Sequence, residues 1–299
     1  MYNILKQFIP NDRLFTNEPL ASYTSMKVGG PADVYVQPDT KEEFVKIIAL
    51  CRQHKEKFII LGNASNVLVP DEGLRMVVIQ LKPHFAGLTC KDNCITAEAG
   101  AMLASVANLA LENELSGLEF ASGIPGTVGG AVCMNAGAYE RDIKGVCTSV
   151  EILMPDGQIK IFDNSEMNFD YRHSILQENG GIVLSAAFTL KPGKQEDIKE
   201  CMRNLNQKRK TSQPLECPSV GSTFKRPPGK YAGKLISDSS LKGYSVGGAK
   251  VSEKHAGFVV NTGDASAQDV LDLMKYIQQK VWEDHAVELE PEVKILCNS

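Results

Sequence analysis

The stretch Ser122-Gly123-Ile124-Pro125-Gly126-Thr127-Val128-Gly129-Gly130 places four glycines and a proline within nine residues. Such a run presents successive main-chain N–H groups with little side-chain obstruction, which suits a pyrophosphate. It matches neither the dinucleotide-binding G-x-G-x-x-G pattern nor the P-loop pattern, so neither of those nucleotide folds is indicated. A set of tight turns between strands explains the same composition, and from these residues alone both interpretations stay open.

A second glycine loop, Gly62-Asn63-Ala64-Ser65-Asn66, lies upstream between two short apolar runs. The runs at 58–61 and 67–69 are each predicted to form a buried strand. An ordinary turn is the alternative interpretation of this loop as well. Two such loops support each other as a nucleotide site only if the fold brings them together.

Helix and strand patterns alternate around the two loops. Thr40 and Glu43 have capping-box spacing, and an apolar stripe follows at Phe44, Ile47, Ile48 and Cys51. A second helix is predicted from near Met102. Strands are predicted at 76–81 and 182–190, with a hairpin formed by 150–154 and 158–162. This order predicts an α/β or α+β architecture.

The polar segment 191–210 is expected to be a connector or a solvated helix and to mark a domain boundary. A strand at 258–260 and a helix opening at Ser266-x-x-Asp269 follow it. A closing strand is predicted over 287–295, where apolar and charged residues alternate. The predicted domains are residues 1–195, with subdomains of about 1–82 and 83–195, and residues 196–299.

Composition excludes several classes of protein. The chain has 299 residues, of which 43% are hydrophobic, and Lys+Arg 32 against Asp+Glu 36 gives a net charge of 32 − 36 = −4. There is no basic excess for nucleic-acid binding and no apolar run long enough to span a membrane. Residues 1–10 include Lys6 and Gln7, which is not typical of a secretory signal peptide. We expect a cytoplasmic monomer.

The eight cysteines show no regular spacing. Cys90 and Cys94, with His84 upstream, form the one arguable metal cluster, but a second ligand pair is missing. We therefore expect no metal site and interpret the cysteines as thiols of the core.

A serine hydrolase is a rival interpretation. Gly243-Tyr244-Ser245-Val246-Gly247 satisfies G-x-S-x-G, and Asp264 and His285 follow it. A nucleophile elbow requires a helix directly after the serine. Residues 248–251 lack helical periodicity, which argues against this enzyme class.

Several longer motifs occur in one order along about residues 20 to 297. They are Gly29-Gly30-Pro31-Ala32-Asp33, the two glycine loops, Asn135-Ala136-Gly137-Ala138-Tyr139, Tyr171-Arg172-His173-Ser174, Gly221-Ser222-Thr223-Phe224-Lys225-Arg226-Pro227 and Leu289-Glu290-Pro291-Glu292-Val293. In these motifs the chain resembles the UDP-N-acetylenolpyruvoylglucosamine reductase family. The short segment 209–222 is similar to the compact variant of that family, which lacks an extra substrate-clamping insertion.

The resemblance implies an α+β fold, in which an FAD-binding domain of the vanillyl-alcohol-oxidase (PCMH) type precedes a smaller α+β substrate domain. It implies non-covalent FAD, NADPH as co-substrate, and reduction of UDP-N-acetylglucosamine enolpyruvate to UDP-N-acetylmuramate for peptidoglycan synthesis. Expected FAD contacts are Gly62, Asn63, Ala64, Ser65, Asn66, Gly123, Ile124, Pro125, Gly126, Val128, Gly129 and Ala138.

The resemblance also assigns catalytic roles. Arg172 would stabilise the carboxylate charge that develops during hydride addition, since its planar guanidinium matches two oxygens. Ser222 would deliver a proton. Glu292 would hydrogen-bond the enolate, and to donate it must be protonated, which requires a pKa raised by burial or by a neighbouring carboxylate. Without the resemblance, a surface ion pair, a turn serine and a solvated strand face explain these residues.

Substrate contacts are expected from Lys225 and Arg226, which could pair with the diphosphate, and from Tyr171 and Lys210. Two other functions remain as alternatives. Another FAD oxidase of the same fold would share the glycine loops but would not need the motifs around Ser222 and Glu292. A non-catalytic UDP-sugar binder would not need the glycine loops.

Overall fold

The computed structural model describes residues 1–81 and 84–298. The chain forms two compact units that alternate along the sequence. The first unit comprises Met1–Phe15, Tyr35–Asn63 and Val78–Arg209, and the second comprises Thr16–Val34, Ala64–Val77 and Lys210–Ser299. The predicted division into residues 1–195 and 196–299 stays a prediction.

The N-terminal part begins with the short helix α1 (Tyr2–Leu5) and contains a four-stranded sheet with the order β1-β2-β5-β3. Its strands are β1 (Leu14–Pro19), β2 (Pro31–Val36), β3 (Phe58–Leu61) and β5 (Leu74–Gln80), and η1 (Leu20–Tyr23) follows β1. Helix α2 (Lys41–Gln53) begins where its capping residue predicts, because Thr40 accepts a hydrogen bond from the Glu43 N–H at 3.2 Å. Its predicted apolar stripe is buried.

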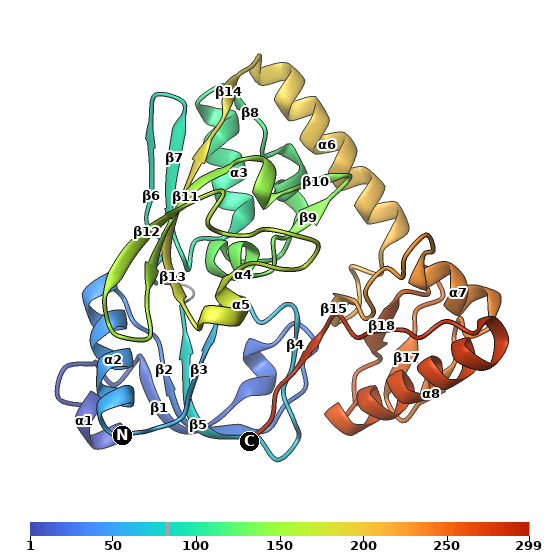
Figure 1. Ribbon diagram of the computed structural model, residues 1–299. Coiled ribbons are helices and arrows are strands. Elements are labelled where there is room, and N and C mark those ends of the chain that lie inside the picture. The colour runs from blue at the N-terminus through green and yellow to red at the C-terminus, as the bar shows by residue number, and fades with distance from the viewer. Residues whose placement is uncertain (82–83, 299) are drawn as a thin grey trace. The chain divides into compact units, whose positions relative to one another are not determined.

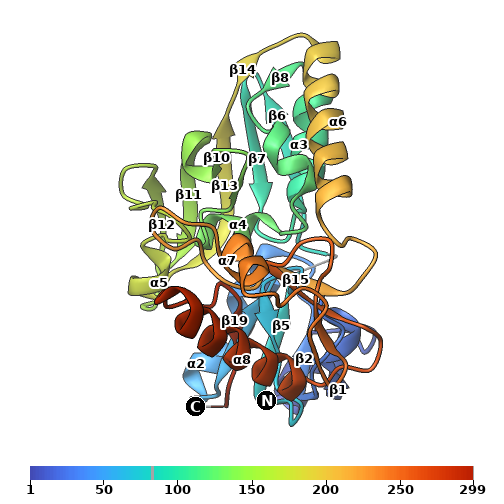
Figure 2. The ribbon, with the colours of Figure 1, turned by 90° about the vertical axis from the view of Figure 1, so that its right-hand side faces the viewer.

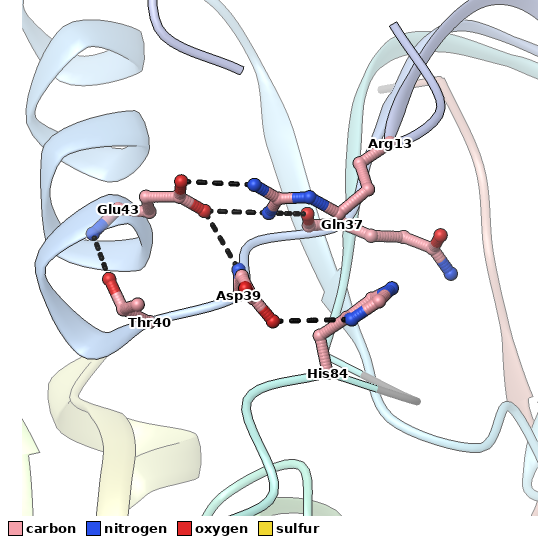
Figure 3. Close-up of polar contacts among 6 residues, drawn as sticks. All are labelled: Arg13, Gln37, Asp39, Thr40, Glu43 and His84. Atoms are coloured by element: carbon pink, nitrogen blue, oxygen red, sulfur yellow. Dashed lines mark hydrogen bonds and ion pairs between the residues drawn. The ribbon is translucent and has the colours of Figure 1, made fainter. Parts of the chain in front are cut away.

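A polar cluster holds the start of α2 to the preceding chain (Figure 3). The Arg13 guanidinium donates to both Glu43 carboxylate oxygens, at 2.7 and 3.1 Å, and to the Gln37 carbonyl at 2.9 Å. The hydrogen bond from Arg13 lowers the pKa of Glu43, although burial opposes the shift. His84 lies 3.2 Å from the Asp39 carboxylate in the same cluster.

Most of the first unit is built on a five-stranded antiparallel sheet with the order β12-β11-β13-β7-β6 (Figure 1). Its strands are β6 (Leu88–Lys91), β7 (Cys94–Glu98), β11 (Cys147–Leu153), β12 (Ile159–Asp163) and β13 (Ile182–Thr189). The predicted hairpin is confirmed by the antiparallel pairing of β11 with β12. Helices α3 (Leu103–Glu112) and α4 (Val128–Cys133) pack on this sheet, and Leu103, Val106 and Val128 are fully buried.

Short elements complete this unit: β8 (Leu115–Ser116), η2 (Glu119–Gly123), β9 (Gly137–Ala138), β10 (Arg141–Asp142), η3 (Ile143–Gly145), α5 (Leu176–Asn179) and β14 (Lys191–Pro192). The polar segment after β14 forms helix α6 (Gln195–Ser212). Figures 1 and 2 show α6 as a single long helix, and the side chain of its first residue, Gln195, donates to the Leu111 carbonyl of α3 at 3.4 Å. Of the two expectations for this segment, the solvated helix is therefore correct.

The second unit contains a four-stranded sheet with the order β15-β18-β17-β16, next to helices α7 and α8 (Figure 1). The elements are β15 (Ser219–Ser222), α7 (Ala232–Asp238), β16 (Ser245–Val246), β17 (Ala249–Val251), β18 (Phe258–Asn261) and α8 (Ala267–His285). The predicted capping box of α8 is present, with Ser266 and Asp269 bonding each other's main chains. The inward face of α8, including Val270, Leu273 and Ile277, is buried in the core of this unit.

The predicted closing strand over 287–295 is wrong for most of its length. Only β19 (Lys294–Ile295) is a strand, and it pairs in parallel with β4 (Val67–Leu68). Leu289 and Val293 are buried as the alternation predicts, but Ile295 is 46% exposed. The segment instead bonds two parts of the second unit in turn. Glu290 and Glu292 bond Lys225 and Thr223, and the N–H groups of Lys294 and Leu296 donate to the carbonyls of Asn66 and Leu68. These hydrogen bonds satisfy its main chain without one continuous ladder.

The exposure of the cysteines tests the expectation that they are thiols of the core. The cysteines are not all core thiols, because Cys51 and Cys147 are buried whereas Cys201 and Cys297 are exposed.

Ser245 lies on β16, and the next element is the strand β17, which pairs with β16. The helix that a nucleophile elbow needs is therefore replaced by a hairpin, and the hydrolase interpretation is wrong.

Candidate active site

The fold brings the two glycine loops together. The Asn63 side-chain amide donates a 2.7 Å hydrogen bond to the Pro125 carbonyl. Gly62 lies against Thr127, and a Cβ built on Gly62 would be 2.1 Å from the Thr127 hydroxyl oxygen. A larger residue at position 62 would push the loops apart, which explains the glycine. The two glycine loops therefore lie next to each other, which a single nucleotide site formed by both of them requires.

The glycines of the second loop are of two kinds. A Cβ on Gly129 would lie 3.1 Å from the Ala99 Cβ, so packing against the sheet explains this glycine. At Gly126 and Gly130 the nearest atoms would be 3.8 and 3.7 Å away, both within the loop itself. Protein packing therefore does not require glycine at 126 and 130, and both positions leave open space on this face of the loop. This open face fits FAD.

Two main-chain N–H groups of this second loop already form hydrogen bonds within the protein. The N–H groups of Val128 and Gly129 each donate at 2.8 Å, to the carbonyls of Ala101 and Ala99. The Val128 side chain is also fully buried. The expectation that successive N–H groups of the loop face a pyrophosphate is thus wrong for these two residues.

Gly123 allows α6 to approach the loop. A Cβ on Gly123 would lie 2.6 Å from the Asn206 amide oxygen and 3.2 Å from an Arg209 guanidinium nitrogen. Asn206 also donates to the Ser122 hydroxyl at 3.2 Å, and Tyr139 donates to the Leu205 carbonyl at 2.9 Å. Nothing in the sequence marks Arg209, because its Lys-Arg-Lys context is typical of a solvated helix.

Arg172 lies at the tip of a tight turn. Asp170 and His173 pair across the turn through main-chain hydrogen bonds of 3.2 and 3.1 Å, which leaves Tyr171 and Arg172 as the two loop residues. Arg172 has φ 56°, in the left-handed region that non-glycine residues rarely adopt. Strained backbone of this kind is often retained where it directs a functional side chain.

Asn135 anchors this turn from the motif that follows α4. Its side-chain amide, buried to 2% exposure, donates at 3.0 Å both to the Asp170 carbonyl and to the Asp142 carboxylate. The Ser174 hydroxyl adds a 2.8 Å hydrogen bond to the Cys133 carbonyl at the end of α4. The glycine-loop helix and the Arg172 turn are therefore held in one framework. Ala138, in the same motif, is half-buried on β9.

Ser222 and Glu292 are brought close in the second unit. The Glu292 N–H donates at 2.8 Å to the carbonyl of Thr223, the residue after Ser222, and the Lys225 N–H donates at 2.8 Å to the Glu290 carbonyl. These bonds join segments that lie far apart in the sequence. Glu292 is half-buried, unlike the exposed Glu288 and Glu290, so the three glutamates do not share one solvated face.

Asn66 connects the first glycine loop to Glu292. Its side chain donates to the Glu292 carbonyl at 3.2 Å, and its own carbonyl accepts from the Lys294 N–H at 3.0 Å. Asn66 was expected to contact FAD, and the structure gives it a role in positioning Glu292. Ala64 and Ser65 lie between the two, and Ala64 adopts φ 46°.

The four expected substrate residues differ in environment. Lys225 forms an ion pair with Glu290, so part of its charge is neutralised within the protein. The Arg226 guanidinium lies 4.6 Å from the centre of the Tyr231 ring, and that of Arg172 lies 5.2 Å from the Tyr171 ring. Lys210 is exposed. Tyr171 and Arg172 belong to the first unit, while the other three belong to the second.

Comparisons with known proteins agree with this geometry. Residues 32–163 match the model of an FAD-binding domain, and residues 213–296 match the C-terminal domain of UDP-N-acetylenolpyruvoylglucosamine reductase. The two linked glycine loops and the two matched domains define an FAD-dependent oxidoreductase with an α+β fold, which confirms the expected fold class and cofactor.

The relatives identify the family. A UDP-N-acetylenolpyruvoylglucosamine reductase from Caldanaerobacter subterraneus is 54% identical, with 98% of this chain and 96% of that protein covered. One from Limosilactobacillus reuteri is 46% identical, with 99% of each covered. The crystal structure of the reductase from Thermus caldophilus has a TM-score of 0.81 at 37% identity, covering 95% of this chain and 98% of that one. The chain belongs to the UDP-N-acetylenolpyruvoylglucosamine reductase family.

Over the residues that the structure describes, no helix combines the length and the apolar character that crossing a bilayer requires.

Proposed function

We propose that this enzyme uses NADPH to reduce UDP-N-acetylglucosamine enolpyruvate to UDP-N-acetylmuramate, a step of peptidoglycan precursor synthesis in the cytoplasm. The observation that carries the proposal is the main-chain pairing of the Ser222 segment with the Glu292 segment, because it places these two residues on neighbouring stretches of chain. FAD supplies hydride transfer from NADPH to the enolpyruvyl double bond. We propose a monomer as the active species.

Arg172 acts on the charge that the reaction creates. Hydride addition to the terminal carbon is conjugate to the carboxylate, so negative charge accumulates on the carboxylate oxygens. A guanidinium presents two parallel donors to such a group and stays protonated throughout. Asn135 anchors the turn on which Arg172 lies, and Arg172 itself has a strained φ of 56°. The main chain from which the guanidinium extends is therefore held in place. Preorganised charge of this kind is an effective form of transition-state stabilisation.

Ser222 delivers the proton that completes the reaction. The carbon next to the carboxylate becomes strongly basic once the hydride has been added, and a hydroxyl can then protonate it. Glu292 hydrogen-bonds the enolate in its protonated form. The lactyl ether is released with one hydride from NADPH and one proton from Ser222, which regains its proton from water.

Substrate binding is assigned to Lys225 and Arg226 for the diphosphate, with Tyr171 and Lys210 as further contacts. Lys225 follows Ser222 by three residues on the same segment, so an anion bound there lies near the proton donor. The ion pair with Glu290 must open or share its lysine when the diphosphate binds. Removing Glu290 is therefore expected to strengthen the interaction of Lys225 with the substrate.

An anaerobic spectroscopic experiment tests the proposal. The purified holoenzyme is treated with NADPH and then with the enolpyruvyl ether of UDP-N-acetylglucosamine. We expect the flavin absorption to bleach in the first step and to recover only in the second. Recovery with oxygen but not with the enolpyruvyl ether would instead identify another FAD oxidase. A chain that NADPH does not bleach would contradict the proposal.

A further inference from the structure

Arg209, near the end of α6, carries a charge that the protein itself leaves poorly matched. Its Nε is buried and has no hydrogen-bond partner among residues 1–81 and 84–298. Burial lowers the pKa of the guanidinium, and the Tyr139 phenol is the ionisable neighbour that opposes the shift. A desolvated cation without a carboxylate partner is costly, so such residues are rare unless a ligand supplies the anion.

The position of Arg209 indicates which ligand this is. Its guanidinium and its Cδ lie 3.2 and 3.3 Å from the place where a Cβ of Gly123 would be. Gly123 opens the loop whose residues Gly126 and Gly130 have a free face. The hydrogen bonds of Asn206 to Ser122 and of Tyr139 to Leu205 hold this part of α6 against the loop region. The arginine is thus fixed beside the surface that FAD occupies.

We propose that Arg209 is an FAD-binding residue whose guanidinium pairs with an anionic group of the bound cofactor. Two groups have this chemistry, namely the pyrophosphate and the pyrimidine edge of the isoalloxazine ring, which becomes anionic on reduction. Both are hydrogen-bond acceptors that a planar guanidinium matches. The inference depends on FAD binding and not on the identity of the sugar substrate.

The test uses Arg209→Gln and Arg209→Lys, with Arg203→Gln as the matched control. Arg203 lies on the same helix, its side chain is 75% exposed, and it forms only an i,i+3 ion pair with Glu200. After removal of the flavin, FAD and riboflavin are titrated separately into each apoprotein. Charge-assisted hydrogen bonds predict that Arg209→Gln weakens FAD binding about 10- to 100-fold, while Arg209→Lys keeps part of the affinity. Arg203→Gln should bind FAD normally.

The same titrations distinguish the two anions. If the pyrophosphate is the partner, riboflavin binds wild type and Arg209→Gln equally, since it lacks that group. If the reduced ring is the partner, the flavin midpoint potential of Arg209→Gln falls relative to wild type and to Arg203→Gln. Both outcomes support the proposal.

Melting temperatures distinguish an FAD-binding role of Arg209 from a purely structural role. Removing an unmatched buried charge should raise the melting temperature of the apoprotein, whereas FAD should stabilise Arg209→Gln less than wild type. A purely structural arginine would lower the melting temperature of the apoprotein. The proposal is overturned if Arg209→Gln and Arg209→Lys both bind FAD with wild-type affinity and potential. Turnover by wild type would then leave the proposed function intact.

Discussion

The side-chain amide of Asn135 donates a 3.0 Å hydrogen bond to the main-chain carbonyl of Asp170, at the base of the turn that carries Arg172. The same amide bonds Asp142, and its oxygen accepts from the Lys144 N–H at 2.9 Å. One buried side chain thus joins three segments of the first unit. Because Arg172 adopts a left-handed conformation, the turn depends on such external support.

We predict that Asn135→Ala lowers kcat for reduction of the enolpyruvyl ether by about 10- to 100-fold, since small displacements of a catalytic group have effects of this size. NADPH should still bleach the flavin at a rate near that of wild type. Asn113→Ala is the control, because the Asn113 side chain also donates to a main-chain carbonyl, that of Leu109 in α3, outside the Arg172 turn. Equal effects of the two substitutions on both half-reactions would argue against a positioning role.

Ser222→Ala is predicted to separate the two half-reactions. Bleaching by NADPH should be unchanged, while reoxidation by the enolpyruvyl ether should slow by about 10²- to 10⁴-fold, the usual contribution of proton transfer. Stopped-flow absorbance of the flavin measures both rates. Ser219→Ala serves as the control, because Ser219 lies on the same strand and is also half-buried. If bleaching by NADPH slowed to the same extent in Ser222→Ala, the serine would not be the proton donor of the second half-reaction.

Two glycines of the second loop should respond differently to alanine. Gly126→Ala is expected to keep the melting temperature of the apoprotein and to weaken FAD binding at least about 10-fold, because the added methyl occupies open space on the ligand face. Gly129→Ala should instead destabilise the apoprotein by roughly 1–3 kcal/mol through overpacking against Ala99. Calorimetry and FAD titration of both variants test the distinction, which the reverse pattern would contradict.

The Arg13–Glu43 pair makes stability depend on pH (Figure 3). The Arg13 hydrogen bond lowers the folded-state pKa of Glu43, so the pair stabilises the protein above the unfolded pKa of about 4.3. This stabilisation is lost as the pH falls through the lower folded pKa. Glu43→Gln should therefore reduce stability by about 1–2 kcal/mol at pH 7, with the difference from wild type vanishing at acidic pH.

Glu42→Gln provides the comparison for this measurement, since Glu42 is exposed one position earlier on α2. Denaturant unfolding of wild type, Glu43→Gln and Glu42→Gln at pH 7 and near pH 3 gives the six free energies needed. A Glu43→Gln deficit that persists unchanged at the lower pH would assign the effect to packing and not to charge.

Thiol reactivity should divide the cysteines by burial. Burial raises the pKa of Cys51 to about 11 and that of Cys147 to about 12. At pH 8 their thiolate fractions are therefore about a thousandth or less, and both side chains are shielded. Peptide mass spectrometry after brief treatment with iodoacetamide should find Cys297 and Cys201 modified first. Modification of Cys147 in the folded protein at the rate of Cys297 would contradict this order.

The local elements follow from the sequence because their determinants are local. Thr40 and Ser266 start their helices through bonds to residues three positions later, and the stripe from Phe44 to Cys51 repeats at the helical period. The hairpin of β11 and β12 needs only two alternating runs and a short turn. The motifs around Gly62, Gly123, Ser222 and Glu292 were sufficient to indicate the family.

Other features depend on partners that are distant in the sequence. The end of the chain reads as a strand from its alternation, yet Glu292 and Lys294 bond to Thr223 and Asn66, and most of the segment forms no ladder. Val128 has the sequence context of a phosphate-binding residue, but Ala101 takes its N–H. The sequence likewise contains no signal that Asn135 supports the Arg172 turn.

The sequence by itself determined helices α2 and α8, the hairpin of β11 and β12 and the family, since each rests on neighbouring residues or on motifs in a fixed order. Only the tertiary structure decided which amides are already occupied, which glycines face open space, and that the half-buried Arg209 beside Gly123 has a buried Nε with no hydrogen-bond partner among the described residues. Hydrogen-bond satisfaction and burial are properties of surroundings that the folded chain creates, and segments far apart in sequence supply them.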